Sequence, residues 1–275
     1  MLSKRLAATV VVCCALAAGA SGCGPAKAPA GSAEAAAPSV SVSASASVSA
    51  SKGPHLDTDK LTAAEIEKQA QAAMASLSSV KVSGNLMVEG QKMTLDLATD
   101  TKGNCQGTIG VAGMGLIEII HTGGSSYLKP DAAFWKAIVG QKGDAKAGAA
   151  AAELFKGRYL TGAKDDPELA ELSDMCDMIK SMTENDDTDD GAIKGAAATV
   201  GEVRTFTVIS TDDDGSRTTA HVATEGKPYL VKVTHEGTDP GEMSFSDFDK
   251  PITVQAPPAD NVIDYSQFRA KIATA

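Results

Sequence analysis

The sequence predicts an α+β fold in which helices pack against an antiparallel β-sheet, behind a disordered N-terminal tether. Apolar residues spaced three and four positions apart open the predicted domain near residue 59. Apolar and polar residues then alternate with a period of two, both before and after a central helical region. Short turns rich in Gly, Asp and Pro separate these segments, as is typical of an antiparallel meander.

The N-terminus has the features of an export signal. Lys4 and Arg5 precede an apolar run over residues 6–18, and small residues lead to Cys23. The segment Ala20-Ser21-Gly22-Cys23 resembles a bacterial lipobox, with Ala20 in place of the usual leucine. We therefore predict a signal peptide over residues 1–22 and an acyl-modified Cys23, which would hold the protein on the extracytoplasmic face of the cell membrane. An uncleaved anchor and an ordinary secretion signal are the alternatives, but the apolar run is shorter than the roughly 20 residues that span a bilayer.

Residues 23–58 form the expected lipid anchor and linker, and residues 59–275 the single expected α+β domain. The linker is rich in Ala, Ser and Pro and has too little apolar surface to offset its ordering entropy, so we predict that it is disordered. Loss of Lys4 and Arg5 with the signal changes the formal net charge from −10 to −12. This acidity argues against nucleic acid as a partner and leaves membrane attachment to the lipid on Cys23.

The domain begins with a predicted helix. Thr62 and Glu65 have the spacing of a capping box, in which each side chain satisfies a free backbone amide of the first turn. Ile66, Ala70, Met74 and Leu77 then repeat at helical spacing and give one apolar stripe.

Two groups of strands follow, separated by helices. The first group is a meander of about five strands, and a short helix over residues 131–139 comes after it. We interpret residues 140–152 as a mobile loop, residues 167–182 as a second helix, and residues 184–190 as a solvated acidic loop. Thr211 to Gly215 has the composition of a hairpin turn. The predicted strands cover residues 80–88, 93–97, 105–109, 116–121, 126–129, 204–210, 217–223, 229–235, 242–248 and 252–255.

The cysteines predict one disulfide. Of the five cysteines, Cys13 and Cys14 leave with the signal and Cys23 is expected to be acylated. Cys105 and Cys176 remain, and an even pair in an oxidising compartment most simply forms a disulfide. A metal site is the alternative, but no histidine lies near either cysteine in the sequence.

The sequence contains no motif that predicts an enzyme, a cofactor or a metal site. The nucleophile elbow, the phosphate-binding loop, the dinucleotide fingerprint and the zinc-protease motif are all missing. His121, His221 and His235 lie in or beside predicted strands, where we interpret them as polar-face residues. The aromatic residues from Tyr127 to Trp135 are interpreted as part of a core cluster rather than a binding patch.

The order of these features resembles the LppX/LprA/LprF/LprG lipoproteins of actinobacterial envelopes, whose fold is similar to that of the LolA/LolB lipoprotein carriers. The resemblance rests on the lipobox, the tether, the N-terminal helix, the interrupted meander and the ending Phe245-Ser246-Asp247-Phe248-Asp249-Lys250-Pro251-Ile252-Thr253-Val254-Gln255-Ala256-Pro257-Pro258. It implies a strongly curved antiparallel sheet, a half-barrel with helices over its concave face. It also implies an apolar cavity for the acyl chains of a lipid or glycolipid.

Three functions remain open from the sequence: a lipid or glycolipid carrier, a surface interaction or structural lipoprotein with a filled core, and an envelope enzyme. No residue points to a particular protein partner. For the carrier, alternation along the strands and the helix stripe select candidate ligand-binding residues: Ile66, Met74, Leu86, Val88, Leu95, Leu97, Ile117, Ile119, Tyr229, Val231 and Phe245.

Overall fold

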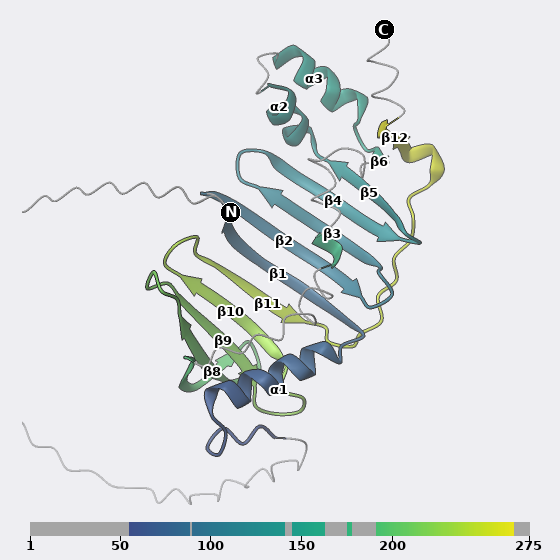
Figure 1. Cartoon of the computed structure of the whole chain (residues 1–275). Helices are drawn as coiled ribbons and strands as arrows, with labels where there is room; N and C mark the ends of the chain where they lie inside the picture. Colours follow the sequence, from purple (N-terminus) through teal and green to yellow (C-terminus); the bar gives the residue numbers. More distant parts are fainter. Residues whose placement is uncertain (1–54, 89, 141–144, 163–174, 178–190, 267–275) are drawn as a thin grey trace, which may run out of the picture. The chain divides into compact units, whose positions relative to one another are not determined.

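The computed structural model describes residues 55–266, except residue 89 and residues 141–144, 163–174 and 178–190 (Figure 1). The expected signal peptide, Cys23 and the linker up to residue 54 lie outside the described residues. So do the acidic loop over residues 184–190 and most of the helix expected over residues 167–182. The part of that helix that is described, Met175–Asp177, is a short 3-10 helix, η2.

The described residues form an α+β fold built on one twelve-stranded sheet, with the strand order β12-β6-β5-β4-β3-β2-β1-β11-β10-β9-β8-β7. All neighbouring strands are antiparallel except β12 and β6, which are parallel. Strands β1 to β5 form one meander and β7 to β11 a second, and the pairing of β1 with β11 joins them. The strands are β1 (Ser79–Val88), β2 (Gln91–Asp100), β3 (Cys105–Val111), β4 (Gly115–Thr122), β5 (Ser125–Pro130), β6 (Tyr159–Thr161), β7 (Ile193–Val200), β8 (Val203–Thr211), β9 (Arg217–Ala223), β10 (Leu230–Glu236), β11 (Gly241–Ser246) and β12 (Val262–Asp264).

Helix α1 (Ala63–Ala75) is the helix that the sequence predicts, and its capping box is present. The Thr62 hydroxyl accepts a hydrogen bond from the Glu65 amide at 3.2 Å, and the Glu65 carboxylate accepts one from the Thr62 amide at 2.8 Å. These reciprocal bonds explain why the helix begins at this position. The buried residues of α1 include Ile66, Ala70 and Met74, as the apolar stripe predicts.

Helix α2 (Ala132–Gly140) also agrees with the sequence, but the loop expected over residues 140–152 is wrong. Residues Ala145–Leu154 form helix α3, because their many alanines are strong helix formers. Gly148 allows α3 to approach α2 closely, since a Cβ at this position would lie 3.2 Å from the Lys136 Cα. The Asp131 side chain starts α2 by accepting a hydrogen bond from the Phe134 amide at 2.8 Å.

Two further differences concern the C-terminal part of the sheet. The strand expected over residues 252–255 is wrong: this segment pairs with no described strand, and the prolines that flank it cannot donate to a ladder. The sequence analysis instead missed the short strand β6 and the strands β7 and β12, the last two of which are the edges of the sheet. A second short 3-10 helix, η3 (Ala259–Asn261), leads into β12.

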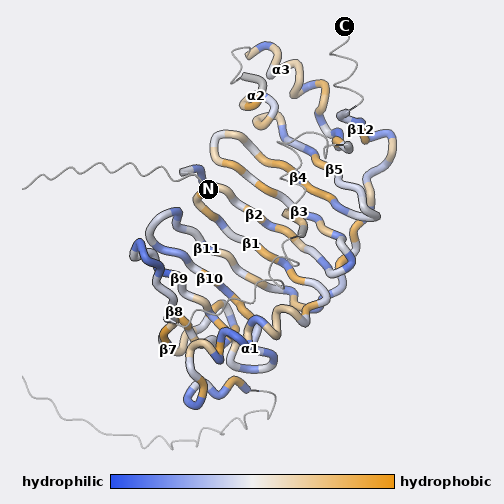
Figure 2. Tube along the Cα trace, viewed as in Figure 1, coloured by the Kyte–Doolittle hydropathy of each residue, from blue (hydrophilic) through white to orange (hydrophobic). Residues whose placement is uncertain are grey.

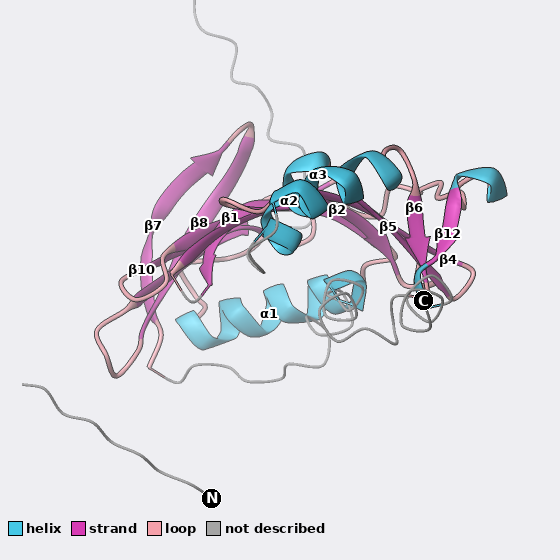
Figure 3. Ribbon diagram, turned by 90° about the horizontal axis from the view of Figure 1, so that it is seen from above, coloured by secondary structure: helices cyan, strands magenta, loops and turns pink. Residues whose placement is uncertain are grey.

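The sheet curves around α1 (Figure 3). Two glycines lie where the backbones of neighbouring strands approach each other closely. A Cβ on Gly84 would lie 2.1 Å from the Glu242 carbonyl oxygen, and one on Gly107 would lie 2.0 Å from the Asp96 carbonyl oxygen. Glycine inside a strand commonly marks such a bend or close approach. A curved, mostly antiparallel sheet with helices on its apolar face is the architecture that the resemblance implies.

The disulfide that the cysteine count predicts is present. Cys105 on β3 is joined to Cys176 in η2, with their Cα atoms 5.6 Å apart. The Thr99 hydroxyl donates a hydrogen bond to the Cys176 carbonyl oxygen at 3.2 Å. Together these contacts hold η2 against β2 and β3.

Candidate functional site

One face of the sheet is apolar, and strand register shows which residues share it. Val82 on β1 lies opposite Phe245 on β11 and Leu97 on β2. Leu95 lies opposite Ile109 on β3, which in turn lies opposite Ile117 on β4. Because side chains that are directly opposite point to the same side of a sheet, these residues form one continuous apolar face across five strands.

Three clusters of buried side chains cover this face, each completed by helical residues. Ile66 of α1 packs with Val208 and Val222 over β8 and β9. Met74, near the other end of α1, packs with the β1, β2 and β11 residues Val82, Leu95 and Phe245. The third cluster joins β2 to β6 to α2, α3 and η2, and its members are Leu97, Cys105, Ile109, Ile117, Ile119, Leu128, Phe134, Trp135, Ala152, Phe155, Leu160 and Cys176.

Between these clusters lies a set of half-buried apolar side chains that we name the apolar row: Leu86, Met93, Val111, Val233 and Met243. Met93 lies opposite both Leu86 and Val111, and Met243 lies opposite Val233. Leu86, Val233 and Met243 pack against the cluster that contains Met74 of α1, and Met93 packs against the third cluster. Figure 2 shows hydrophobic segments along the strands that carry the row. Helix α1 lies against β7 to β10, and α2 and α3 lie beyond β4 and β5 (Figure 1).

Glycines reduce the side-chain bulk beside the apolar row. Gly84 lies between Leu95 and Met243 in register, and Gly241 lies opposite Leu86. Neither position has room for a Cβ, because one would lie 2.1 Å from the Glu242 oxygen at Gly84 and 2.7 Å from the Asn85 oxygen at Gly241. The apolar face therefore combines long flexible side chains with two positions that have none.

The structure distributes the sequence-predicted ligand residues over the same face. Eight are buried, Leu86 and Tyr229 are half-buried, and Val88 is 43% exposed. Val231 is buried but belongs to none of the three clusters. The register of β10 shifts between Leu230 and Lys232, and Leu230 packs against the cluster that contains Met74. The buried residues are Ile66, Met74, Leu95, Leu97, Ile117, Ile119, Val231 and Phe245.

The sequence analysis did not single out four members of the apolar row. Met93 shares the alternation of Leu95 and Leu97, so the period-two pattern could have identified it. Val111, Val233 and Met243 also lie two residues from Ile109, Val231 and Phe245, but only the pairing of the strands shows that they lie beside Met93 and Leu86. The register of β10, β11 and β1 supplies that information, and it is not contained in any local pattern.

The opposite face of the sheet is polar and carries cross-strand ion pairs. Lys81 lies 3.1 Å from Asp96 and Lys232 lies 2.7 Å from Glu242. The structure places His221 on this face, in register with Lys232, as expected. His121 and His235 instead lie in register with apolar-face residues, so the polar-face interpretation is wrong for both; their rings are accommodated by hydrogen bonds to Ser126 and Thr218.

A polar cluster lies near the sheet edge at β4, β5 and β6. The Lys129 Nζ is 2.5 Å from a Glu118 oxygen and 3.2 Å from the Tyr159 hydroxyl, which also donates to Glu118. Burial opposes ionisation of Glu118, but the bonds from Lys129 and Tyr159 lower the pKa of its carboxyl. Burial and the adjacent carboxylate raise the pKa of Tyr159. These groups satisfy one another and form no nucleophile–base pair.

Three cavities lined by described residues include no member of the apolar row, and one of them, of about 380 Å³, lies on the polar face between Lys81 and Ile120. One of about 260 Å³ lies beside the Glu118–Lys129 pair and α3, and one of about 590 Å³ is lined by polar residues of the 211–216 turn and by His235. Among the described residues, no group of three or more His, Cys, Asp or Glu side chains is placed to hold a metal ion. No helix in the described part of the chain is long and apolar enough to cross a membrane.

Among known proteins, this chain is similar only in fold to solved structures at low sequence identity. No family model and no curated protein matches this chain. The crystal structure of LprF from Mycobacterium bovis is similar at 13% identity and a TM-score of 0.48, covering 72% of this chain and 97% of LprF. The Mycobacterium tuberculosis lipoprotein LppX is similar at 13% identity and a TM-score of 0.44, covering 70% of this chain and 98% of LppX. The architecture thus weakly resembles those two lipoproteins, and function must be argued from the site.

Proposed function

We propose that this protein is a lipid-anchored lipoprotein of the extracytoplasmic membrane face that binds acyl chains of a lipid or glycolipid on the apolar row. The observation that carries the proposal is the half-burial of five apolar side chains on one face of the sheet, in two adjacent lines of paired residues. Methionines at two of the five positions provide a flexible surface that adapts to chains of different shape.

The anchor supports the same function. The lipobox-like residues before Cys23 would place the domain beside a bilayer, where lipid ligands are available. The net charge of the chain is negative, so the acyl chains on Cys23 supply the attachment and the apolar row the ligand contact.

A surface interaction protein with a filled core is the second candidate. It is favoured by the close packing under α1, where Ile66 and Val82 are both 0% exposed. The two candidates differ in one testable respect, because only the first requires the apolar row to bind a ligand.

The test is displacement of a fluorescent fatty-acyl probe from the purified full chain by phospholipid. Leu86→Gln places a polar amide in the row and should weaken binding about tenfold or more, since it removes a buried apolar contact and adds a desolvation cost. Met87→Gln is the matched control, because Met87 is also half-buried but points to the opposite face of β1. Equal binding by both variants would contradict the proposed site, and no binding by the unaltered protein would contradict the function.

A further inference from the structure

Two cavities on the polar side of the sheet meet at one residue, Glu118. The cavity of about 380 Å³ is lined by residues of β1 to β4, the other, of about 260 Å³, by residues of β4, β5, α2 and α3, and Glu118 lines both. Glu118 lies opposite Thr108 on β3 and Lys129 on β5, so the three side chains share the polar face. We name the two cavities together the polar trough. It crosses β1 to β5, a distance of about 19 Å at the usual strand spacing.

The charged side chains that line the polar trough are already paired within the chain. Six of them form three ion pairs with nitrogen–oxygen distances of 3.1, 2.5 and 3.6 Å: Lys81–Asp96, Lys129–Glu118 and Lys156–Glu153. The remaining one, Asp131, accepts the hydrogen bond from the Phe134 amide that starts α2. A charged ligand would therefore have to displace one of these partners, which argues against an anion or a cation as the ligand.

Pairing leaves the same groups able to bind a neutral polar ligand. A carboxylate has about four acceptor sites and an ammonium group has several donors, so each ion pair keeps free sites for further hydrogen bonds. Gln106 and Thr108 add an amide and a hydroxyl to the lining of the larger cavity. The smaller cavity adds apolar surface from Leu116, Pro130 and Ala132. Donors, acceptors and apolar surface thus lie side by side along the polar trough.

The middle of the polar trough is held in place by Tyr159. The Lys129 Nζ is 3.2 Å from the Tyr159 hydroxyl and 4.6 Å from the centre of its ring, and this hydroxyl donates to Glu118. Both charged side chains are therefore fixed before a ligand arrives, which reduces the ordering cost of binding.

We propose that the polar trough binds a neutral oligosaccharide. A sugar hydroxyl can donate to a carboxylate and accept from an ammonium group at once, so one ligand group serves both members of an ion pair. A peptide fits less well, because extended peptides add to the edge of a sheet and none of β1 to β5 is an edge strand. The polar trough lies on the face opposite the apolar row, so this second ligand is independent of the proposed lipid.

The test is calorimetric titration of the purified full chain with neutral gluco-, manno- and galacto-oligosaccharides, each as a disaccharide and as a hexasaccharide. We expect at least one hexasaccharide to bind, and to bind more tightly than its disaccharide, because only the longer sugar reaches both cavities. Asp96→Asn removes a charged acceptor and should weaken binding about tenfold. Gln106→Ala changes an exposed side chain outside the ion pairs and should weaken binding several-fold.

Glu242→Gln is the matched control for Asp96→Asn. Glu242 lies 2.7 Å from Lys232 in a cross-strand ion pair on the same face of the sheet, but it lines neither cavity, so this variant should bind like the natural protein. Absence of binding by every sugar at millimolar concentration would overturn the proposal, as would equal affinity of the two trough variants and the control. Tighter binding of tetralysine or tetraglutamate than of any neutral sugar would overturn the ligand class. Binding of the acyl probe without any sugar would leave the proposed lipid function standing.

Discussion

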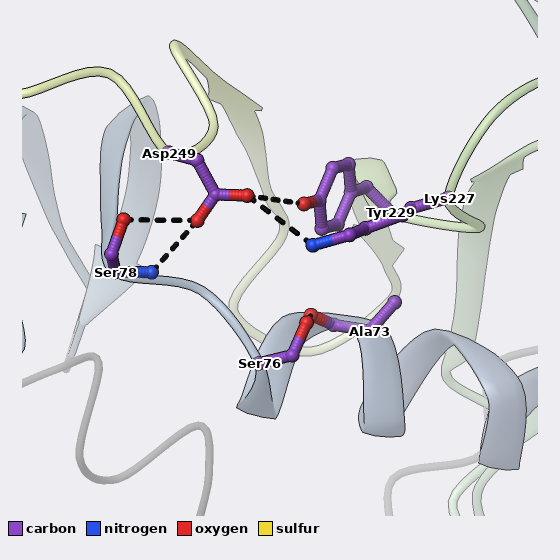
Figure 4. A network of polar contacts seen from close by, with 6 residues as sticks. All are labelled: Ala73, Ser76, Ser78, Lys227, Tyr229 and Asp249. Atoms are coloured by element: carbon purple, nitrogen blue, oxygen red, sulfur yellow. Dashed lines mark hydrogen bonds and ion pairs between the residues drawn. The ribbon is translucent and has the colours of Figure 1, made fainter.

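Asp249 holds the connection between α1 and β1, and its replacement should destabilise the fold in a defined way. Its carboxylate accepts hydrogen bonds from the Ser78 amide at 2.8 Å, the Ser78 hydroxyl at 3.0 Å and the Tyr229 hydroxyl at 2.7 Å, and Lys227 lies 3.4 Å away (Figure 4). Ser78 lies between the end of α1 and the start of β1. The network therefore fixes the helix that closes one side of the apolar face.

Three variants separate the contributions at this site. Asp249→Asn keeps an acceptor but removes the charge. We expect it to lower the free energy of unfolding by about 1 kcal/mol. This is a small value for hydrogen bonds to a charged group, because solvent screens the exposed carboxylate. Asp249 has a φ of 57°, which asparagine and glycine tolerate better than alanine. Asp249→Gly should therefore cost about 1–2 kcal/mol through lost bonds, and Asp249→Ala about 1 kcal/mol more through backbone strain.

The pH dependence gives an independent check. The hydrogen bond from the Ser78 amide has the largest effect in lowering the pKa of Asp249, and the bonds from the Tyr229 and Ser78 hydroxyls lower this pKa further. A carboxyl with a lowered pKa in the folded state contributes its full stability above its unfolded pKa of about 4 and loses it as the pH falls further. Urea denaturation should show a constant difference between the natural protein and Asp249→Asn from pH 5 to 7, and a shrinking difference below pH 4. Equal stability of the two proteins at pH 7 would refute the reasoning.

The remaining predictions concern the anchor, the disulfide and the first helix. Cys23→Ala should release the protein from the membrane fraction or leave an unprocessed precursor, as judged by fractionation and mass; normal processing with unchanged retention would contradict acylation. Peptide mapping without reductant should recover Cys105 linked to Cys176, and the double serine variant should lose about 4 kcal/mol of stability; free thiols at both positions after native purification would contradict the link. Thr62→Ala should cost about 1 kcal/mol by removing the capping hydroxyl, whereas Thr58→Ala, outside the capping box, should cost less than half of that.

Local patterns predicted most of the elements because those elements are governed by local physics. The capping box of Thr62 and Glu65 and the alternation in β1 to β5 could both be read directly from the sequence. Helix α3 was missed because its Ala- and Gly-rich composition was interpreted as a loop. Its close packing on α2 at Gly148 depends on a contact that the sequence does not display.

The candidate site was only partly predictable for a related reason. Alternation along single strands identified Leu86, Leu95 and Phe245 as candidates for one face. It could not show that β11 pairs with β1, or that a bulge shifts β10 at Val231. The sequence also could not predict that the buried Trp135 Nε1 has no hydrogen-bond partner among the described residues, because hydrogen-bond satisfaction depends on how the core packs.

The claim that the apolar row binds a lipid is tested most directly by extracting lipid from the protein after its purification from the native membrane. The extract should be compared with that of Leu86→Gln, with Met87→Gln as the matched control, and the lipid of the Cys23 anchor should be counted separately from extractable lipid. The account predicts about one non-covalent acyl lipid per natural or Met87→Gln chain, and much less from Leu86→Gln. Absence of extractable lipid from the natural protein, together with no displacement of an acyl probe, would contradict it.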